Sequence, residues 1–131
     1  MALIAGGVVA AILIASIVFV APFAHAMLNT PFNDRPFDRS TWLRAANDDG
    51  LRNPRGPMAD DLRRRYLRPE MTKSAVRELL GKPSNSEEDE RRGNVDRYNI
   101  GAWGVFPIDP YYIVIHYDPA GRIISTRIEG T

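Results

Sequence analysis

The sequence predicts an α+β protein, in which an N-terminal transmembrane or signal helix precedes two helices packed on a three-stranded antiparallel sheet. Three observations indicate this fold class: an uncharged apolar run at the start, two capped stretches of helical periodicity in the middle, and three strand-like runs in the last third. Strands that follow helices instead of alternating with them are typical of α+β domains. We divide the chain into an anchor or signal peptide at 1–26, a linker with a short helix at 27–57, and a folded domain at 58–131.

The composition argues against several classes of function. The chain has 131 residues, no cysteine, and 17 basic against 16 acidic residues, for a formal net charge of +1. Without cysteine we expect no disulfide, no thiolate nucleophile, no thiolate metal ligand and no lipid on an N-terminal cysteine. The balanced charge argues against nucleic-acid binding, whose footprint is a basic excess. We therefore expect no cofactor and no nucleic-acid partner.

The N-terminal run predicts contact with a membrane. No residue from Ala2 to Ala24 is charged, and residues 3–21 are dominated by Ala, Ile, Val and Leu. About twenty residues of helix, at 1.5 Å each, cross a hydrocarbon core of roughly 30 Å. Two fates stay open: a retained anchor, or a signal peptide that is cleaved near Ala26 after a small-x-small triplet. The length of the run and the lack of a basic leader favour the anchor.

The orientation across the membrane is also open. Arg35, Arg39 and Arg44 follow the run, and no Lys or Arg precedes it. By the positive-inside rule, this asymmetry favours a domain that faces the cytoplasm. The resemblance described below favours export instead, so we expect the domain in the periplasm, and a cytoplasm-facing domain is the alternative.

The segment before the domain has the composition of a tether. Residues 27–40 contain two prolines and scattered charges, which favour extended backbone. Ser40 is a suitable cap for a short helix over 41–47. Residues 48–57 then interrupt regular structure with Gly50, Pro54, Gly56 and Pro57.

The first helix of the domain is predicted over 58–67. Pro57 suits the position at its start, and apolar side chains recur at helical spacing at Met58, Leu62 and Tyr66. The basic run 63–65 follows Asp60 and Asp61 by one helical turn. Acid-to-base spacings of i,i+4 suit ion pairs, so we expect this run to be a solvated helix face.

The second helix is predicted over 73–80 and has the clearest ends in the sequence. Thr72 is its N-cap, and its apolar stripe consists of Val76, Leu79 and Leu80. Gly81 occupies the place of a C-cap glycine, and Pro83 prevents continuation of the helix.

The last third of the chain predicts an antiparallel meander. Residues 82–94 are polar and charged, as is typical of a solvated loop. Strands follow at 95–100, 111–117 and 122–128, and the middle one is the richest in β-branched and aromatic residues. The sequence DPAG at 118–121 joins the last two strands as a tight hairpin. We expect the helices to cover one face of this sheet.

Residues 66–83, YLRPEMTKSAVRELLGKP, resemble the L-x-x-G-M-[ST]-x-x-x-V-x-x-x-L-G-x-P signature of the BamE (SmpA/OmlA) domain family. Residues 98–101, YNIG, resemble the tyrosine-x-x-glycine strand of that family, and residues 112–127 resemble its closing hairpin. The resemblance covers about residues 58–129. Two departures stand out: Glu70 occupies a position where the family usually has glycine, and the lipobox cysteine is absent.

The resemblance implies a bacterial envelope protein that binds other proteins, with its domain in the periplasm. The best-known member of the family is an accessory lipoprotein of outer-membrane β-barrel assembly. Units of this ααβ type also resemble the β-lactamase-inhibitor protein fold, another protein-binding role. The signature residues cap and pack the fold, so they carry no chemistry of their own.

No set of residues in the sequence indicates an enzyme. His116 lies inside the middle strand and shares a face with Tyr112 and Val114, without a recognisable nucleophile and carboxylate to form a catalytic set. Asp109 and Asp118 lie near it in sequence, but their spacing matches no metal-ligand pattern. We expect no catalytic, cofactor-binding or metal-binding residue.

The candidate contact surface is the apolar loop 101–110, GAWGVFPIDP, between two strands. Aromatic side chains are enriched at binding hot spots. We therefore take Trp103 and Phe106, with Tyr98 and Tyr112 on the neighbouring strands, as the candidate protein-contact residues. The alternative is that both rings of the loop fold back over the core.

The leading hypothesis is a non-enzymatic envelope protein-interaction module that uses its sheet and the loop 101–110. The module is anchored in the membrane through residues 3–21, and its partner is an unidentified envelope protein. The second hypothesis is a small secreted inhibitor or immunity-type protein, released by cleavage near Ala26. The third is a hydrolase that uses His116.

Overall fold

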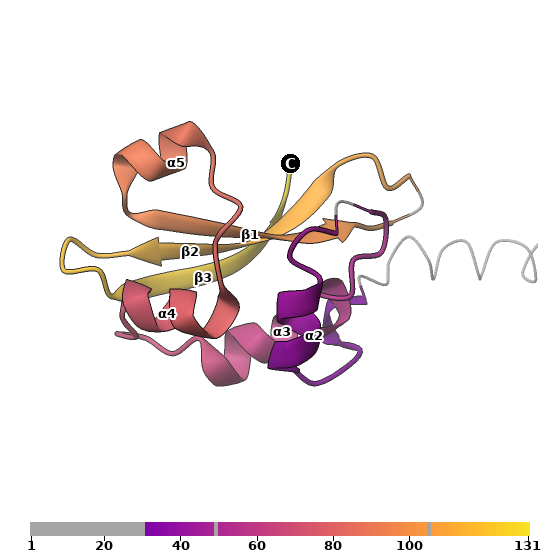
Figure 1. Cartoon of the computed structure of the whole chain (residues 1–131), viewed down its shortest axis with the longest axis horizontal. Coiled ribbons are helices and arrows are strands. Elements are labelled where there is room, and N and C mark those ends of the chain that lie inside the picture. Colours follow the sequence, from indigo (N-terminus) through magenta and orange to yellow (C-terminus); the bar gives the residue numbers. More distant parts are fainter. Residues whose placement is uncertain (1–30, 49, 105) are drawn as a thin grey trace, which may run out of the picture. The chain divides into compact units, whose positions relative to one another are not determined.

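The computed structural model describes residues 31–48, 50–104 and 106–131. The predicted transmembrane or signal helix and the predicted cleavage site lie outside these residues. Among the described residues, no helix is long and apolar enough to span a membrane. The described part is α+β, as predicted, and residues from Pro31 onward form one compact unit (Figure 1). Its elements are η1 (Pro31–Asn33), α2 (Arg39–Arg44), η2 (Gly56–Met58), α3 (Ala59–Asp61), η3 (Leu62–Tyr66), α4 (Lys73–Leu80), α5 (Glu87–Arg92), β1 (Val95–Ala102), β2 (Pro110–Tyr117) and β3 (Ile123–Gly130).

The sheet is the predicted antiparallel meander, with the strands in the order β1-β2-β3. The hairpin turn forms at Asp118, whose carbonyl accepts a hydrogen bond from the Gly121 amide (2.9 Å) and whose carboxylate accepts one from the Arg122 amide (2.9 Å). Gly121 has φ +78°, a left-handed conformation that glycine adopts without steric cost. The prediction of this turn from the sequence DPAG is therefore confirmed.

Helix α4 has the ends that the sequence predicts. The Thr72 hydroxyl accepts a hydrogen bond from the Ala75 amide (3.1 Å) at the N-terminus, and Gly81 ends the helix at φ +80°. Val76 and Leu80 on its apolar stripe are fully buried. Caps and periodicity are local features, which is why the sequence suffices to predict them.

The first predicted helix is composite. A 3₁₀ turn (η2), one α turn (α3) and a π turn (η3) follow one another, and the Leu67 amide bonds to the Leu62 carbonyl five residues earlier (3.1 Å). The predicted i,i+4 ion pairs are present, from Arg64 to Asp60 (2.9 Å) and from Arg65 to Asp61 (3.3 Å). Local acids therefore partner this part of the basic run.

The segment predicted as a linker contributes to the core from Pro31 onward, so the compact unit begins earlier than we predicted. The short helix α2 begins at Arg39, two residues before the predicted start, and its cap is Asp38 instead of Ser40. The Asp38 carboxylate accepts a hydrogen bond from the Thr41 amide (3.2 Å), because extended backbone at Asp38 points its side chain at the helix end. Trp42 of this helix is fully buried and donates to the Leu80 carbonyl (3.0 Å).

The loop predicted at 82–94 contains helix α5, which corrects that prediction. Ser86 and Asp89 form a capping box, in which each side chain accepts from the backbone amide of the other (3.1 and 3.0 Å). Gly93 ends the helix in the left-handed region. In Figure 1, α5 lies on the face of the sheet opposite to α2, α3 and α4. Helices therefore lie over both faces of the sheet, and not over one face as predicted.

The core lies between the sheet and the helices α2, α3 and α4. Every second residue of β2, on the face opposite to the one predicted for His116, joins it: Ile113, Ile115 and Tyr117. The fully buried side chains that fill this core include Trp42, Met58, Leu62, Val76, Leu80, Tyr98 and Ile100. This packing covers the face of the sheet that carries Ile113 and Ile115, so that face is closed to a partner.

Candidate interaction surfaces

The residues that we considered for catalysis lie apart from one another. His116 is half-buried on β2, and its neighbours across the ladder are Val95 and Ser125, neither of which is a carboxylate. The Asp118 carboxylate is engaged by the hairpin turn. No cluster of three His, Cys, Asp or Glu side chains suited to a metal ion occurs within the described residues. This arrangement offers no support for the hydrolase hypothesis.

The most buried charged group of the sheet is Asp96 on β1. Its carboxylate, which is fully buried, accepts two hydrogen bonds from Arg77 (2.7 and 3.1 Å), one from Tyr117 (2.9 Å) and one from Asn85 (2.9 Å). Burial raises the pKa of Asp96, but these hydrogen bonds outweigh it and hold the pKa below its usual value of 3.8. A carboxylate so fully partnered has no free lone pair for a substrate, so its role is structural.

A second buried charge, Arg55, lies under helix α2. Its guanidinium stacks over the Trp42 ring at 4.4 Å, and its Nε donates to the Trp42 carbonyl (2.9 Å). One terminal nitrogen has no hydrogen-bond partner among the described residues. Burial lowers the pKa of Arg55 to about 10. The side chain is 2 % exposed, so it is closed to a ligand from solvent.

Two of the four predicted contact residues belong to the packing of the domain. Tyr98 is fully buried and donates to the Gly81 carbonyl (2.9 Å), so it is no contact residue. Trp103 folds back over the core, as in the alternative that we considered. Its ring nitrogen donates to the Ile100 carbonyl (2.7 Å), and its ring packs edge-on against Phe32. A Cβ on Gly56 would lie only 2.4 Å from the Trp103 ring. We therefore expect Trp103→Ala to lower stability, contrary to a role mainly in partner contact.

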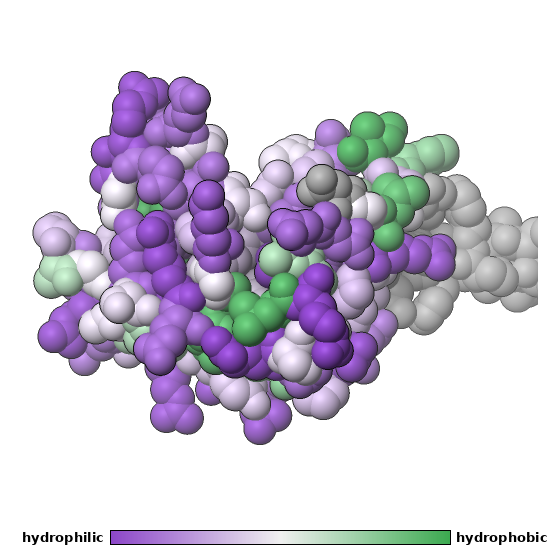
Figure 2. Space-filling model, viewed as in Figure 1, coloured by the Kyte–Doolittle hydropathy of each residue, from purple (hydrophilic) through white to green (hydrophobic). Residues whose placement is uncertain are grey.

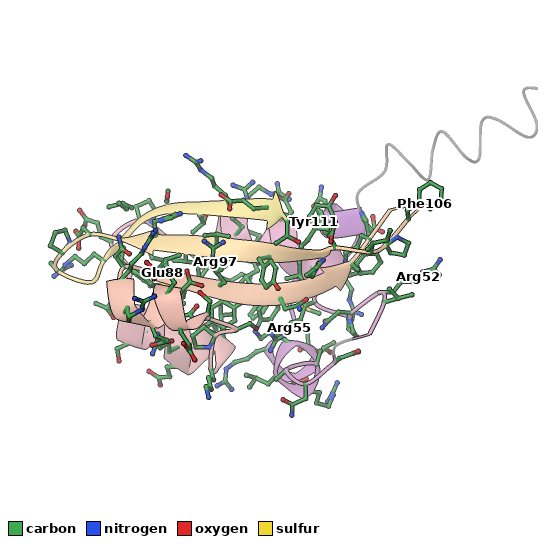
Figure 3. The ribbon with its side chains drawn as sticks, turned by 90° about the horizontal axis from the view of Figure 1, so that it is seen from above. Arg52, Arg55, Glu88, Arg97, Phe106 and Tyr111 are labelled. Carbon is green, nitrogen blue, oxygen red and sulfur yellow. The ribbon has the colours of Figure 1, made fainter. Side chains whose placement is uncertain are left out.

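Phe106 is the predicted contact residue that projects into solvent, with 76 % of its surface exposed. Ile108 (81 %) and Leu51 (64 %) are also exposed, and a parallel bridge between Leu51 and Ala102 ties the two segments together. Figure 3 places Phe106 and Arg52 at the same end of the ribbon, and Figure 2 shows apolar side chains protruding there. We call Leu51, Arg52, Phe106 and Ile108 the tip.

Tyr112, the fourth predicted contact residue, lies half-buried on the face of the sheet that carries α5. A shallow hollow on this face is lined by Tyr112, Arg97, Asp89 and Thr131 among others. Arg97 also donates to the Asp89 carboxylate (3.1 and 3.2 Å), which fastens α5 to the sheet. This face is therefore partly covered by the chain itself.

The outer edge of β1 is closed by the residues before α5. The Ser84 amide donates to the Arg97 carbonyl (2.6 Å), and the Asn85 side-chain oxygen accepts from the Arg97 amide (2.7 Å). The Ser84 hydroxyl also accepts from the Asn99 amide (3.3 Å). Further along β1, the bridge from Leu51 to Ala102 continues the closure. These contacts occupy the groups that a further strand would use.

The outer edge of β3 is open among the described residues. The backbone N–H and C=O groups of Arg97 point away from β2. Along an antiparallel strand this direction alternates from residue to residue, so the backbone groups of Asp96 and of its ladder partner Ile115 point toward each other. The backbone groups of Val114 therefore point toward β3, and those of its partner Arg127 point toward β2. The backbone groups of Thr126 and Ile128 then point away from the sheet, toward its outer edge. Segment 70–73 pairs with residues 121–123, but no described backbone group bonds to the outward side of 124–130.

Comparisons with protein-family models, with curated proteins and with solved structures found no match. At the tip, sequence reasoning selected Phe106 and missed Leu51 and Ile108. The signal for Ile108 was its position in the same apolar loop, whereas nothing in the sequence links Leu51 to that loop. Elsewhere, sequence reasoning selected Tyr112, which lines the hollow, and did not name Thr126 or Ile128 at the edge of β3.

Proposed function

We propose that this chain is a membrane-anchored, non-enzymatic binding module of the cell envelope that receives an extended segment of a partner protein along β3. The observation that supports this proposal most directly is the contrast between the closed edge of β1 and the open edge of β3. An open strand edge presents unpaired N–H and C=O groups, and addition of a peptide strand to such an edge is a recurrent mode of protein recognition.

Thr126 and Ile128 supply the backbone groups for such pairing. Their neighbours Ile124, which is exposed, and Arg127 flank the edge with one apolar and one basic side chain. A partner segment with an apolar residue beside Ile124 and an acidic residue beside Arg127 would complement these two side chains. The resemblance to the BamE (SmpA/OmlA) family supports the same class of function, a protein-binding role in the bacterial envelope.

The anchor in this proposal rests on the uncharged run at 3–21. We place the domain in the periplasm, in keeping with the family resemblance and against the charge asymmetry of the flanking arginines. The test is to express the tagged full-length chain in a bacterium, fractionate the cells and determine the N-terminus by mass. An intact Met1 in the membrane fraction, with the domain protected from protease until the outer envelope is opened, is the expected result. An N-terminus at Met27 in the soluble periplasm would replace the anchor by secretion and favour an inhibitor-type protein.

The binding edge is tested by photo-crosslinking in the same cells. A photoreactive phenylalanine replaces Thr126 at the open edge or, as a control, the exposed Ala120 in the hairpin turn. We expect a discrete protein adduct from position 126 and none from position 120. Equal adducts from the two positions, or none from position 126, would contradict binding along β3.

A further inference from the structure

We infer that the tip docks into the lipid surface that the N-terminal run of the same chain enters. The inference rests on the anchor of the proposed function and adds a second contact, with lipid as the ligand of Leu51, Phe106 and Ile108. It assigns these three exposed side chains to the bilayer interface instead of to a protein partner. The partner-binding edge at β3 stays separate from it.

The first step of the argument is the chemistry of the tip. Three large apolar side chains are each exposed by more than half, whereas most other large apolar residues that the structure describes are buried or half-buried, with Ile124 and Tyr66 as the exceptions. Removal of such side chains from water is favourable in proportion to the apolar area buried. The tip projects from the domain and does not form a groove. It therefore suits insertion into a lipid bilayer, which requires no complementary shape.

The second step is that contacts order the base of the loop and a local turn at its exposed end. Trp103 fastens it through its hydrogen bond to the Ile100 carbonyl (2.7 Å), and the Ile108 amide donates to the Phe106 carbonyl (2.8 Å). Gly101, at φ +95°, lets the strand approach Asn53, whose backbone nitrogen would lie 2.8 Å from an added Cβ. The contacts of Trp103 and Gly101 order the base of the loop, and the bond between Ile108 and Phe106 keeps the two exposed side chains in one local turn, which lowers the entropy cost of docking them.

The third step is where the chain joins the domain. Phe32 is buried, and its ring packs against Tyr111 (5.1 Å between centroids) and Trp103 (6.5 Å). The tether therefore joins the domain beside the loop that carries Phe106. Ala21, the last residue of the run 3–21, is eleven residues before Phe32. Even fully extended, eleven residues span at most about 40 Å.

The covalent link thus keeps the tip near any membrane that the run 3–21 enters. Short tethers give effective concentrations in the millimolar range, which makes weak contacts productive. The hairpin turn 118–121 lies at the other end of the sheet (Figure 1), far from this attachment point. It therefore serves as an internal control for any measurement of lipid contact.

The charges at the tip do not by themselves select an anionic surface. Arg52 is exposed beside the apolar residues, but Asp109 is exposed in the same loop. The apolar side chains consequently dominate the interaction. We expect docking on vesicles of neutral phosphatidylcholine, with only a small gain when anionic lipid is added.

The test uses the absence of cysteine from the chain. A single cysteine at Ile108→Cys or, as a control, at Ala120→Cys is labelled with an environment-sensitive fluorophore in the full-length chain, which is then reconstituted in phosphatidylcholine vesicles. With brominated lipid in the vesicles, we expect the label at position 108 to be quenched at least twofold more than the label at position 120. The added substitution Phe106→Asp should remove most of this difference while the chain still floats with the vesicles.

The outcomes separate the two proposals. A chain that floats with the vesicles but shows equal, weak quenching at positions 108 and 120 overturns docking of the tip and leaves the anchor intact. A chain that does not float overturns the anchor, and the docking proposal with it. Quenching at position 108 that survives Phe106→Asp would also count against the tip, because burial would then not depend on its apolar side chains.

Discussion

On the β1 side of the sheet, Arg97 finds partners for both of its backbone groups within its own chain, whereas on the β3 side Thr126 and Ile128 find none among the described residues. Both strands are equally long and equally paired to β2. The difference lies in two segments placed against β1 by contacts across the fold: Ser84 and Asn85 lie beside Arg97, and Leu51 lies beside Ala102.

The comparison shows that closing an edge requires specific side chains. Asn85 bonds to the Arg97 amide, to the Val95 carbonyl and to the buried Asp96 carboxylate. Soluble proteins commonly block edges in this way to prevent unwanted strand pairing. The edge of β1 is closed by dedicated contacts and the edge of β3 is open among the described residues, and the following experiments test whether the open edge pairs with a partner.

The largest effect should come from Asp96→Ala, which removes the carboxylate beneath the closed edge. The substitution removes the shorter of the two ion pairs of Arg77, leaving the one to Glu90 (3.8 Å), and leaves the buried Tyr117 hydroxyl without an acceptor. We expect a loss of roughly 3 kcal/mol in the free energy of unfolding, measured by chemical denaturation. Asp109→Ala, at an exposed acid, is the control and should change stability by no more than about 0.5 kcal/mol. Equal losses would show that Asp96 does not hold this side of the fold.

A pair of proline substitutions should separate the inward and outward positions of β3. Arg127→Pro removes an N–H that faces β2, so we expect a loss of about 2–3 kcal/mol in the free energy of unfolding. Thr126→Pro removes an N–H that faces the open edge and should cost less than about 1 kcal/mol. Thr126→Pro should nevertheless abolish crosslinking of the partner from a photoreactive residue placed at Ile128. Retained crosslinking in that variant would mean that β3 does not bind by strand pairing.

A smaller effect is expected from Asn85→Ala, which opens the edge of β1 without removing a charge. The substitution deletes the acceptor of the Arg97 amide, and we expect a loss of about 1–2 kcal/mol in stability. Hydrogen exchange should report the change locally, with reduced protection of the Arg97 amide and little change at Arg127 on β3. If protection of the Arg97 amide is unchanged, Asn85 is not what closes this edge.

The smallest effect is expected from mild acid. The pKa of Asp96 is lowered in the folded state, so its stabilising contribution is complete above its unfolded pKa of about 3.9 and is lost as the pH falls through the folded value. We expect the free energy of unfolding to be constant from pH 7 to about pH 5 with respect to this group and to decrease below pH 4. In Asp96→Asn, the decrease below pH 4 should be shallower. An identical slope in both proteins would assign the acid sensitivity to other carboxylates.

Much of the fold could be predicted because its signals are local. Thr72 and Gly81 mark the ends of α4, and the sequence 118–121 sets the hairpin, each through backbone preferences within a few residues. Helix α5 was missed although its capping box, Ser86 and Asp89, stands in the sequence. Its run of charges is equally typical of a solvated loop. The structure adds the hydrogen bond from Arg97 to Asp89, which fastens this segment to the sheet as a helix.

The candidate surfaces were less predictable from the sequence. Alternation along a strand predicts which residues share a face of the sheet. It does not predict that helices cover the face that carries Tyr98 and bury this side chain completely. Trp103 and Phe106 stand three residues apart in one loop, yet one ring packs on the core and the other is exposed.

The sequence by itself determined the α+β class, the meander, the caps of α4, and the ion pairs of the basic run, because each depends on residues close together in the chain. Only the tertiary structure decided which edge of the sheet is closed. The residues that close it, Ser84 and Asn85, meet Arg97 and Asp96 across about a dozen positions of sequence. Hydrogen bonds of this kind leave no periodic pattern, since their partners are brought together by packing and not by the local conformation of the chain.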